Sequence, residues 1–274
     1  MPETAAPSIL RFENVTVSYD GEAVLTDISF EAFEGESRVI LGAAGSGKTV
    51  LLKTALGLVR PDSGRVLAFG QELGTMREAQ LFDIRSRIGM LFQESALFDS
   101  LNIEENVAYP LINQKSIRCP ASEVHARVEE ALDFVDLGGT LEKFPSELSG
   151  GMRRRAAIAR AVVTGPPLVL YDSPSAGLDP ITAHTIMALL IKERDMAQTT
   201  TLLVTYRYQD GNLMANFRYN SKQGRLEPAR NWDGPLPRTT FMVLRDGRLV
   251  FEGDQDRLES TADDYISKFC KQRE

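Results

Sequence analysis

Apolar and polar positions alternate along two early stretches of the chain, residues 9–19 and 25–30. This alternation predicts two β-strands that form a small antiparallel sheet. Three later stretches are short and mainly apolar, at residues 38–41, 168–171 and 201–205. Short apolar runs of this kind are typical of strands that are buried on both faces of a sheet. The pattern therefore predicts a central sheet of buried strands, preceded by a smaller antiparallel sheet.

Helices are predicted between the buried strands. After the first strand, apolar side chains recur on one side of a helix, at Val50, Leu51, Ala55 and Leu58. After the second, Asp179 and Pro180 supply an N-cap and a first-turn proline for a helix over residues 181–196. Strands that alternate with helices predict an α/β fold, with a mostly parallel core sheet covered by helices on both faces.

The middle of the chain carries helical patterns instead of strand patterns. From residue 94 to residue 147 we expect helical segments, including 103–107 and 124–134. Prolines are expected to separate these segments, at Pro110, Pro120 and Pro145. We therefore predict a helical subdomain, inserted into the α/β domain over about residues 94–160.

The composition of this 274-residue chain is that of an ordinary globular protein, with 43% hydrophobic and 25% charged residues. The net charge of −7 argues against broad electrostatic binding to nucleic acid or to an anionic membrane. No apolar run approaches the roughly 18–20 residues of a membrane span, and residues 1–8 have no secretory-signal pattern. We therefore expect a cytoplasmic protein that binds no nucleic acid and reaches a membrane only through a partner.

Cysteines and histidines are few and scattered. Cys119 and Cys270 lie far apart and outside any C-x-x-C motif, and His125 and His184 are also separated. This spacing predicts reduced thiols and no zinc site.

One segment carries a specific chemical pattern. Residues 42–49 read Gly42-Ala43-Ala44-Gly45-Ser46-Gly47-Lys48-Thr49, which satisfies G-x-x-x-x-G-K-[ST] between a predicted strand and a predicted helix. A glycine loop at a helix start directs backbone N–H groups and the positive end of the helix dipole into one small volume, which suits a polyphosphate. Lys48 is then expected at the β- and γ-phosphate oxygens, and Thr49 is a candidate ligand for Mg²⁺.

Two further segments extend this site. Asp172 ends a buried strand, so that its carboxylate can orient Mg²⁺ together with Thr49, although an aspartate in such a place is also a common cap or turn residue. Leu148-Ser149-Gly150-Gly151-Met152 opens a predicted helix, and Ser149 suits its N-cap. Two glycines directly after the N-cap destabilise the start of a helix, so they are expected only where another group must approach the backbone closely. A phosphate is such a group.

Residues 148–152 resemble the signature motif of the ATP-binding cassette family. Phe92-Gln93 resembles that family's Q-loop, residues 175–179 its D-loop, and Tyr19 the aromatic residue on which adenine stacks. The resemblance extends from about residue 9 to residue 253, with five motifs in order. It implies a phosphate-loop ATPase fold whose cofactors are ATP and Mg²⁺.

The same resemblance implies a site shared by two subunits. Ser149, Gly150 and Gly151 of one cassette would contact the γ-phosphate of the nucleotide that the other cassette binds. Asp179, in the D-loop, would also contact the nucleotide. Gln93 would act in catalysis and at the metal, and its region, with the helical subdomain, would transmit dimer closure to a membrane permease.

Two positions depart from the family pattern. Ser173 follows Asp172 where the family usually has a glutamate that polarises the attacking water, and Tyr206 stands where it usually has a histidine that contacts the γ-phosphate. A serine hydroxyl cannot serve as a base at neutral pH, and general-base catalysis is worth about 10²–10⁴ in rate. A tyrosine donates one hydrogen bond but carries no positive charge. Both positions stay candidate catalytic residues, and we predict ATP binding with impaired hydrolysis.

Alternatives to impaired hydrolysis remain open. Glu94 or Asp179 could supply the missing carboxylate, or the two replacements could be engineered.

We expect one ATP-binding domain over residues 8–254 and a C-terminal helical tail over 255–274. Within the domain, residues 209–239 are about twice as long as the family needs there, and they predict an extra hairpin and loop. This insertion is either a tolerated surface addition or a contact with a partner subunit.

The segment over residues 90–101, with Glu105-Asn106-Val107 and Pro110-Leu111, most resembles cassettes of bacterial phospholipid-trafficking systems, the maintenance-of-lipid-asymmetry and toluene-tolerance group. That resemblance implies a second cassette, identical or different, and an integral membrane permease with a lipid-binding periplasmic protein. The chain would be peripheral on the inner face of the cell membrane. Two other interpretations are a non-hydrolysing, ATP-sensing partner cassette and a non-transport cassette protein acting on DNA or ribosomes.

Overall fold

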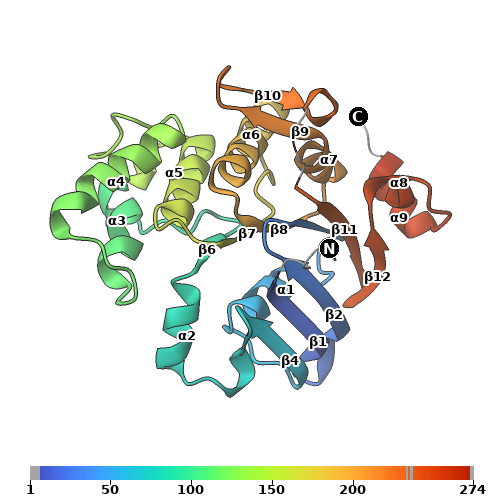
Figure 1. Ribbon diagram of the computed structural model, residues 1–274. Coiled ribbons are helices and arrows are strands. Elements are labelled where there is room, and N and C mark those ends of the chain that lie inside the picture. Colours follow the sequence, from blue (N-terminus) through green and yellow to red (C-terminus); the bar gives the residue numbers. More distant parts are fainter. Residues whose placement is uncertain (1–6, 233, 235–236, 272–274) are drawn as a thin grey trace, which may run out of the picture.

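The computed structural model describes residues 7–232, 234 and 237–271, and it is built around a twisted six-stranded sheet (Figure 1). The strands of this sheet run in the order β12 (Arg248–Gly253), β11 (Thr239–Arg245), β3 (Ser37–Leu41), β8 (Thr200–Thr205), β7 (Leu168–Asp172) and β6 (Ile88–Leu91). All neighbouring pairs are parallel except β11 and β12. The three strands predicted from short apolar runs are therefore confirmed as the buried centre of a mostly parallel sheet.

A second, antiparallel sheet packs below the first in Figure 1. Its strands lie in the order β2 (Glu22–Phe33), β1 (Ser8–Tyr19), β4 (Ser63–Ala68) and β5 (Gln71–Glu72). Helix α1 (Lys48–Ala55) lies between the two sheets, and its Leu51, Leu52 and Ala55 join one hydrophobic cluster with both of them. The short helix η1 (Leu73–Thr75) and α2 (Glu78–Arg85) complete this side of the molecule.

The opposite face of the large sheet is covered by helices, most of which lie at the left and top of Figure 1. They are α3 (Ile103–Asn113), α4 (Ala121–Phe134), η2 (Pro145–Glu147), α5 (Gly150–Val162) and α6 (Pro180–Ala197). Alternate residues of the buried strands face the two sides. Val169 and Tyr171 of β7 join the hydrophobic cluster that these helices form on their side of the sheet, called the helical cluster below. Leu168 and Leu170 join the hydrophobic cluster around α1 on the other side. This division explains why those strands are apolar at every position.

Two details of the predicted helices are wrong. Pro110 lies inside α3 instead of ending a helix, because Ile103, Val107 and Leu111 bury one face of α3 and this packing outweighs the loss of one N–H donor. Leu58 lies beyond the end of α1 and is 51% exposed, so it does not belong to the apolar side of that helix.

The segment expected as a hairpin and loop begins instead with a helix, α7 (Tyr208–Asn216). After it come the antiparallel strands β9 (Phe217–Asn220) and β10 (Arg225–Pro228), and then η3 (Ala229–Asn231). Residues 233, 235 and 236 of the expected loop lie outside the described residues. The chain continues after β12 with α8 (Gln255–Glu259) and α9 (Asp264–Lys271), and residues 272–274 of the expected tail are not described.

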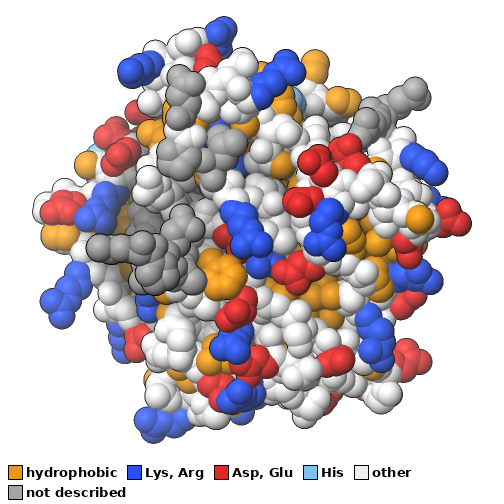
Figure 2. All heavy atoms as spheres, turned by 45° about the vertical axis from the view of Figure 1, so that its right-hand side comes forward, with side chains coloured by type: hydrophobic (Ala, Val, Ile, Leu, Met, Phe, Trp, Pro, Cys, Tyr) orange, Lys and Arg blue, Asp and Glu red, His pale blue; other side chains and the backbone are white. Residues whose placement is uncertain are grey.

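Neither acidic nor basic side chains predominate on the face that carries β12, α8 and α9. Figure 2 brings this face forward and shows basic and acidic side chains interspersed on it. Within the described part of the chain, no helix combines the length and the apolar character needed to cross a lipid bilayer.

Candidate nucleotide-binding site

Four neighbouring parallel strands end at the same edge of the large sheet, and the predicted site residues follow these ends. Leu41 of β3 pairs with Thr205 of β8, and Asp172 of β7 pairs with Val204. The phosphate loop (residues 42–49), Tyr206 and Ser173 therefore begin side by side, and Gln93 follows β6 at the same edge. The carboxyl edge of a parallel sheet is the usual place for a ligand in α/β proteins.

The phosphate loop has the backbone shape that phosphate binding requires. Gly45 and Gly47 adopt positive φ angles of 78° and 100°, and α1 begins immediately afterwards at Lys48. Gly47 is the N-cap and provides no side-chain hydrogen bond, so the first-turn N–H groups of α1 are left for a ligand. At Gly42 a Cβ would lie 2.8 Å from the Leu244 carbonyl oxygen, and this clash with backbone explains the glycine there.

Lys48 lies inside the loop, with only 8% of the residue exposed. Its ammonium nitrogen donates to the carbonyl oxygens of Gly42 and Ala43, at 2.8 and 2.7 Å. Burial lowers the pKa of Lys48, and the nearby Asp172 carboxylate partly opposes that shift. The lysine charge is thus held within the loop by backbone dipoles that a polyphosphate can replace.

Thr49 and Asp172 form a pair of oxygen groups beside the loop. The Thr49 hydroxyl donates to Asp172 Oδ2 at 2.7 Å, and Asp172 is 2% exposed. A hydroxyl and a carboxylate are the hard oxygen ligands that Mg²⁺ prefers, and Mg²⁺ is commonly bound by one or two such groups together with phosphate. No group of three or more His, Cys, Asp or Glu suited to a metal occurs among the described residues. The donor set therefore fits Mg²⁺ that is held jointly with a polyphosphate.

Ser173 presents a hydroxyl at the position after this aspartate. Its backbone has a positive φ of 47°, and its N–H donates to Val204 O at 2.8 Å. The Ser173 hydroxyl donates to Asp172 Oδ1 at 3.1 Å and is buried with it. The backbone of Ser173 is thus fixed to β8, and its hydroxyl, which is a weak acid and not a base, points toward the Asp172 carboxylate.

The two carboxylates considered as substitutes have different surroundings. Asp179 Oδ1 accepts hydrogen bonds from the N–H groups of Ile181 and Thr182 at 3.1 and 3.0 Å, which caps α6 as predicted. Hydrogen bonds from Thr182 lower the pKa of Asp179, which favours the charged form. Glu94 lies in an exposed turn next to Gln93, which is also exposed.

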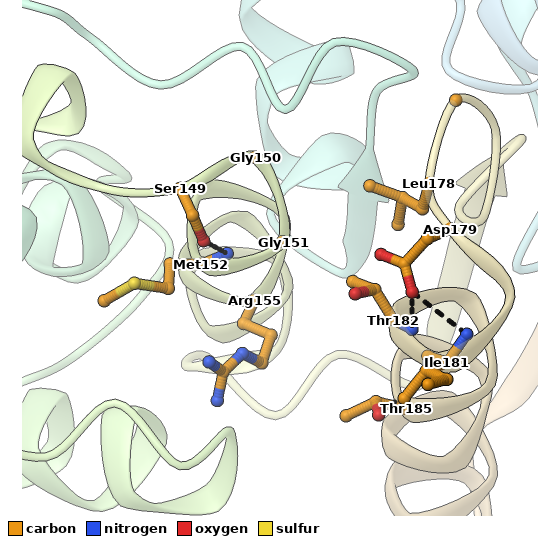
Figure 3. Close-up of a pocket in the computed structure, with 11 residues that line it drawn as sticks. Ser149, Gly150, Gly151, Met152, Arg155, Leu178, Asp179, Ile181, Thr182 and Thr185 are labelled. Carbon is orange, nitrogen blue, oxygen red and sulfur yellow. Dashed lines mark hydrogen bonds between the residues drawn. The ribbon is translucent and has the colours of Figure 1, made fainter.

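The signature residues line a cavity of about 470 Å³ between α5 and the start of α6 (Figure 3). Ser149 Oγ accepts a hydrogen bond from the Met152 N–H at 3.3 Å, so the predicted N-cap is confirmed. Asp179 lines the same cavity from the α6 side. A Cβ at Gly151 would lie 2.7 Å from the Thr182 methyl group, so helix contact explains this glycine, whereas a Cβ at Gly150 would meet only the Arg153 guanidinium, at 4.0 Å.

Arg154 connects two of the candidate segments, and sequence reasoning missed it. This buried side chain donates to the carbonyl oxygens of Phe92 and Gln93, and more weakly to that of Ala176 at 3.5 Å. Burial lowers the pKa of Arg154, and the Asp172 carboxylate raises it. The three consecutive arginines at 153–155 were the only sequence signal.

Asp210 on α7 is a second residue that the sequence did not single out. Its Oδ2 accepts hydrogen bonds from the hydroxyls of Ser175 and Thr205, at 2.6 and 2.7 Å. Burial raises the pKa of Asp210, and these two hydrogen bonds oppose the shift. The carboxylate thereby ties the D-loop segment to the end of β8, just before Tyr206.

Tyr19 and Tyr206 are both well exposed, at 47% and 45%. Tyr19 ends β1, and the turn that follows leads to Val24. The Val24 carbonyl packs closely against Gly47, since a Cβ added at Gly47 would lie 2.8 Å from it. The open ring of Tyr19 is thus carried by a hairpin that touches the phosphate loop. Within the described chain, neither tyrosine hydroxyl makes a hydrogen bond, so both rings are available to a ligand or partner.

Comparison with known proteins supports one family. The family model described as ABC transporter matches residues 25–176. The Escherichia coli K12 intermembrane phospholipid transport system ATP-binding protein MlaF is 35% identical over 97% of this chain and 90% of its own length. The Mycobacterium leprae protein named "Probable ribonucleotide transport ATP-binding protein mkl" is 38% identical over 72% of this chain. The alignment spans only 56% of that mycobacterial protein.

Solved structures agree with this result. A dimeric post-hydrolysis state of an ATP-binding cassette bound to ADP and Pi has a TM-score of 0.73 and 29% identity, and the match covers 89% of this chain and 98% of that one. The structure of cbiO1 from Clostridium perfringens, part of the ABC transporter complex cbiONQ, has a TM-score of 0.75 and 25% identity, covering 97% and 95% of the two chains. Together with the phosphate loop and signature geometry, these matches show that the chain is an ATP-binding cassette and belongs to the ABC transporter family.

Proposed function

We propose that this chain binds Mg-ATP at the phosphate loop and drives a phospholipid transporter as one of two paired cassettes. The observation that carries the proposal is the cluster of Lys48, Thr49 and Asp172 at the start of α1. It unites a buried cation, a hydroxyl and a carboxylate with the open N-terminus of a helix. These groups together suit a magnesium-bound polyphosphate.

Each site residue has a proposed role. Tyr19 stacks on adenine, the amides of residues 42–49 and Lys48 bind the phosphates, and Thr49, Asp172 and Gln93 hold Mg²⁺. Residues of the signature cavity, namely Ser149, Gly150, Gly151 and Asp179, contact the nucleotide of the second cassette. The exposed Gly150 and the cavity of about 470 Å³ support this assignment, because they leave room for an incoming phosphate.

Hydrolysis by this cassette is proposed to be slow. The Ser173 hydroxyl is directed to Asp172, and Tyr206 offers an exposed neutral hydroxyl at the end of β8. Neither group can take a proton from water at neutral pH or place a positive charge on the γ-phosphate. An ATP-sensing cassette that pairs with an active one is the second candidate function, and the same two residues favour it.

A membrane permease is the proposed partner, and an apolar groove supports it. The groove, of about 320 Å³, lies between the Q-loop region and α3. Among the residues that line it, Leu58, Phe98 and Tyr109 are 51%, 42% and 42% exposed. Exposed apolar side chains gathered in this way are typical of protein interaction sites. This surface is continuous with Phe92, so that a bound permease segment can act on the neighbouring Gln93.

Phospholipid is the proposed cargo, and the two groups of relatives support it to different degrees. The proteins named for phospholipid transport align over almost the full length of both chains, whereas those named for ribonucleotide transport align over little more than half of theirs. A lipid-binding periplasmic protein is then a further proposed component. The chain would act at the cytoplasmic face of the inner membrane, through the permease.

Affinity purification from membranes of the source cell tests this function. We expect the chain to bring down an integral membrane permease together with a lipid-binding protein. Tyr109→Glu in the groove should abolish this association, whereas Phe82→Glu should not, because Phe82 is 61% exposed but lies outside the groove. Recovery of ribosomes or DNA-associated proteins, or a permease that the Tyr109→Glu variant retains, would contradict the proposal.

A further inference from the structure

Tyr265 of α9 reaches the phosphate loop from the far end of the chain. Its hydroxyl accepts a hydrogen bond from the Ala43 N–H at 3.2 Å and donates one to the Leu244 carbonyl at 3.2 Å. Ala43 is the second residue of the phosphate loop, and Leu244 belongs to β11. A single hydroxyl of α9 therefore contacts both the phosphate loop and β11, near the carboxyl end of that strand.

The position of this hydroxyl is fixed by the packing of α9. The apolar face of α9 is buried in the helical cluster through Ile266, Phe269 and Cys270. Asp263 Oδ1 accepts hydrogen bonds from the N–H groups of Tyr265 and Ile266, at 2.8 and 3.1 Å. The Tyr265 ring also meets the Phe269 ring edge-on, with centroids 5.3 Å apart. The helix can thus hold the hydroxyl in place whether or not the loop is ordered.

One peptide group links the Tyr265 contact to Lys48, the lysine of the phosphate loop. The peptide between Gly42 and Ala43 donates its N–H to Tyr265, and its carbonyl accepts from Lys48 Nζ at 2.8 Å. Because a peptide group is planar, any rotation of this one moves both hydrogen bonds together. The orientation that Tyr265 imposes on the peptide therefore also places one of the two carbonyl oxygens that hold the Lys48 ammonium, the other being that of Ala43 at 2.7 Å.

We propose that Tyr265 is a positioning residue for ATP binding, which acts by fixing the Gly42–Ala43 peptide and, through it, Lys48. The inference rests on the proposed binding of ATP at the phosphate loop. A loop that is already ordered loses less conformational freedom when a phosphate binds. Loss of the hydroxyl should therefore weaken the binding of the phosphate chain and leave the adenine contact unchanged.

Tyr265→Phe tests this directly, because it keeps the ring and removes only the hydroxyl. Calorimetry should give a Kd for ATP that is about three- to tenfold higher than in the native protein, the factor that one net hydrogen bond corresponds to. The Kd for inorganic tripolyphosphate, which lacks adenine, should rise by a similar factor. The melting temperature without nucleotide should stay within about 2 °C, since the packing of α9 is kept. Tyr219→Phe is the matched control, because within the described chain the Tyr219 hydroxyl makes no hydrogen bond.

Amide exchange in the native protein gives a second measurement that does not depend on a variant. The Ala43 N–H should exchange more slowly than the Ala44 N–H, which makes no hydrogen bond to any described residue, and Tyr265→Phe should remove the difference. If Lys48→Ala binds ATP as tightly as the native protein, the proposed nucleotide site is wrong. If Lys48→Ala loses ATP while Tyr265→Phe keeps the native Kd and Ala43 exchanges as fast as Ala44, only the role of Tyr265 is wrong.

Discussion

The hydroxyl of Thr49 donates a 2.7 Å hydrogen bond to the carboxylate of Asp172, which lies 123 residues further along the chain. This bond joins the start of α1 to the end of β7 at the carboxyl edge of the sheet. Lys48, the neighbour of Thr49 in the chain, is buried, and the Asp172 carboxylate lies close enough to raise the pKa of its ammonium. The pair is thus assembled before any ligand arrives, and it offers a metal two oxygen ligands from separate elements.

Thr49→Val should selectively remove the effect of magnesium. The substitution preserves the side-chain volume but deletes a proposed metal ligand, so the gain in ATP affinity on adding Mg²⁺ should fall by about 1.5–3 kcal/mol. Affinity measured in excess EDTA should be nearly that of the native protein. Titration calorimetry with and without Mg²⁺ provides the comparison, and Thr75→Val on exposed η1 is the control. An equal magnesium effect in native protein and Thr49→Val would remove Thr49 from the metal site.

Arg154→Lys should destabilise the protein although it conserves the charge. The guanidinium of Arg154 spans carbonyl oxygens of Phe92, Gln93 and Ala176, which an ammonium cannot reach together. Partly buried carbonyl oxygens would lose their donor, at a cost of roughly 1–3 kcal/mol in the free energy of unfolding. Urea denaturation measures this loss, with Arg118→Lys at an exposed position as the control. Equal unfolding midpoints for the two variants would show that these contacts do not stabilise the Q-loop region.

Glu193 should make stability depend on pH near neutrality. Burial raises its pKa from 4.5 to about 7, opposed by hydrogen bonds from Thr199 and Tyr171 and by Arg194, while Asp195 adds to the rise. The folded state binds the proton of the Glu193 carboxyl more tightly than the unfolded state does. The stabilising effect of this proton is therefore full below pH 4.5 and is lost as pH rises through about 7.

Glu193→Gln should therefore flatten the stability profile between these pH values, by at most about 3 kcal/mol. Unfolding free energies at pH 5 and pH 8 measure the effect, and the exposed Glu130→Gln variant is the control. A native profile that is already flat over this range, or one that Glu193→Gln leaves unchanged, would contradict the assigned shift.

Local patterns in the sequence predicted the parts of the site that lie within one segment. The strand, loop and helix around residues 42–49 and the buried strand ending at Asp172 need only neighbouring residues to be recognised, because their apolar runs and glycines fix the local backbone. The N-caps at Ser149 and Asp179 were predicted for the same reason. Pro110 was misplaced, since the packing of α3 outweighs a local rule.

Long-range contacts made by residues outside a recognised motif were beyond sequence reasoning. Arg154 meets Gln93 across 61 positions, and Tyr265 meets Ala43 across 222. Neither residue has a local motif that names its partner, because the contact is set by how α5 and α9 pack on the sheet. Helix α7 was also missed, so the role of Asp210 between the D-loop and β8 became visible only in the fold.

Ser173 and Tyr206 together predict slow turnover at an otherwise intact nucleotide site. If only the water-polarising carboxylate and the γ-phosphate histidine are missing, ATP should bind and close the cassette dimer while phosphate is released very slowly. Ser173→Glu should raise the rate by up to roughly 10²-fold, because a base acts chiefly in the transition state. Tyr206→His should raise the rate further. The two effects should not be additive, since both side chains act on one γ-phosphate.

Single-turnover phosphate release from Mg-ATP separates slow hydrolysis from weak binding. It should be measured for the native chain, Ser173→Glu, Tyr206→His, the double variant and Lys48→Ala, alone and with the permease. We predict slow release by the native chain, faster release by Ser173→Glu, and none by Lys48→Ala. Brisk native release that Lys48→Ala abolishes and Ser173→Glu leaves unchanged would contradict the account, and would point to Glu94 or Asp179 as the base.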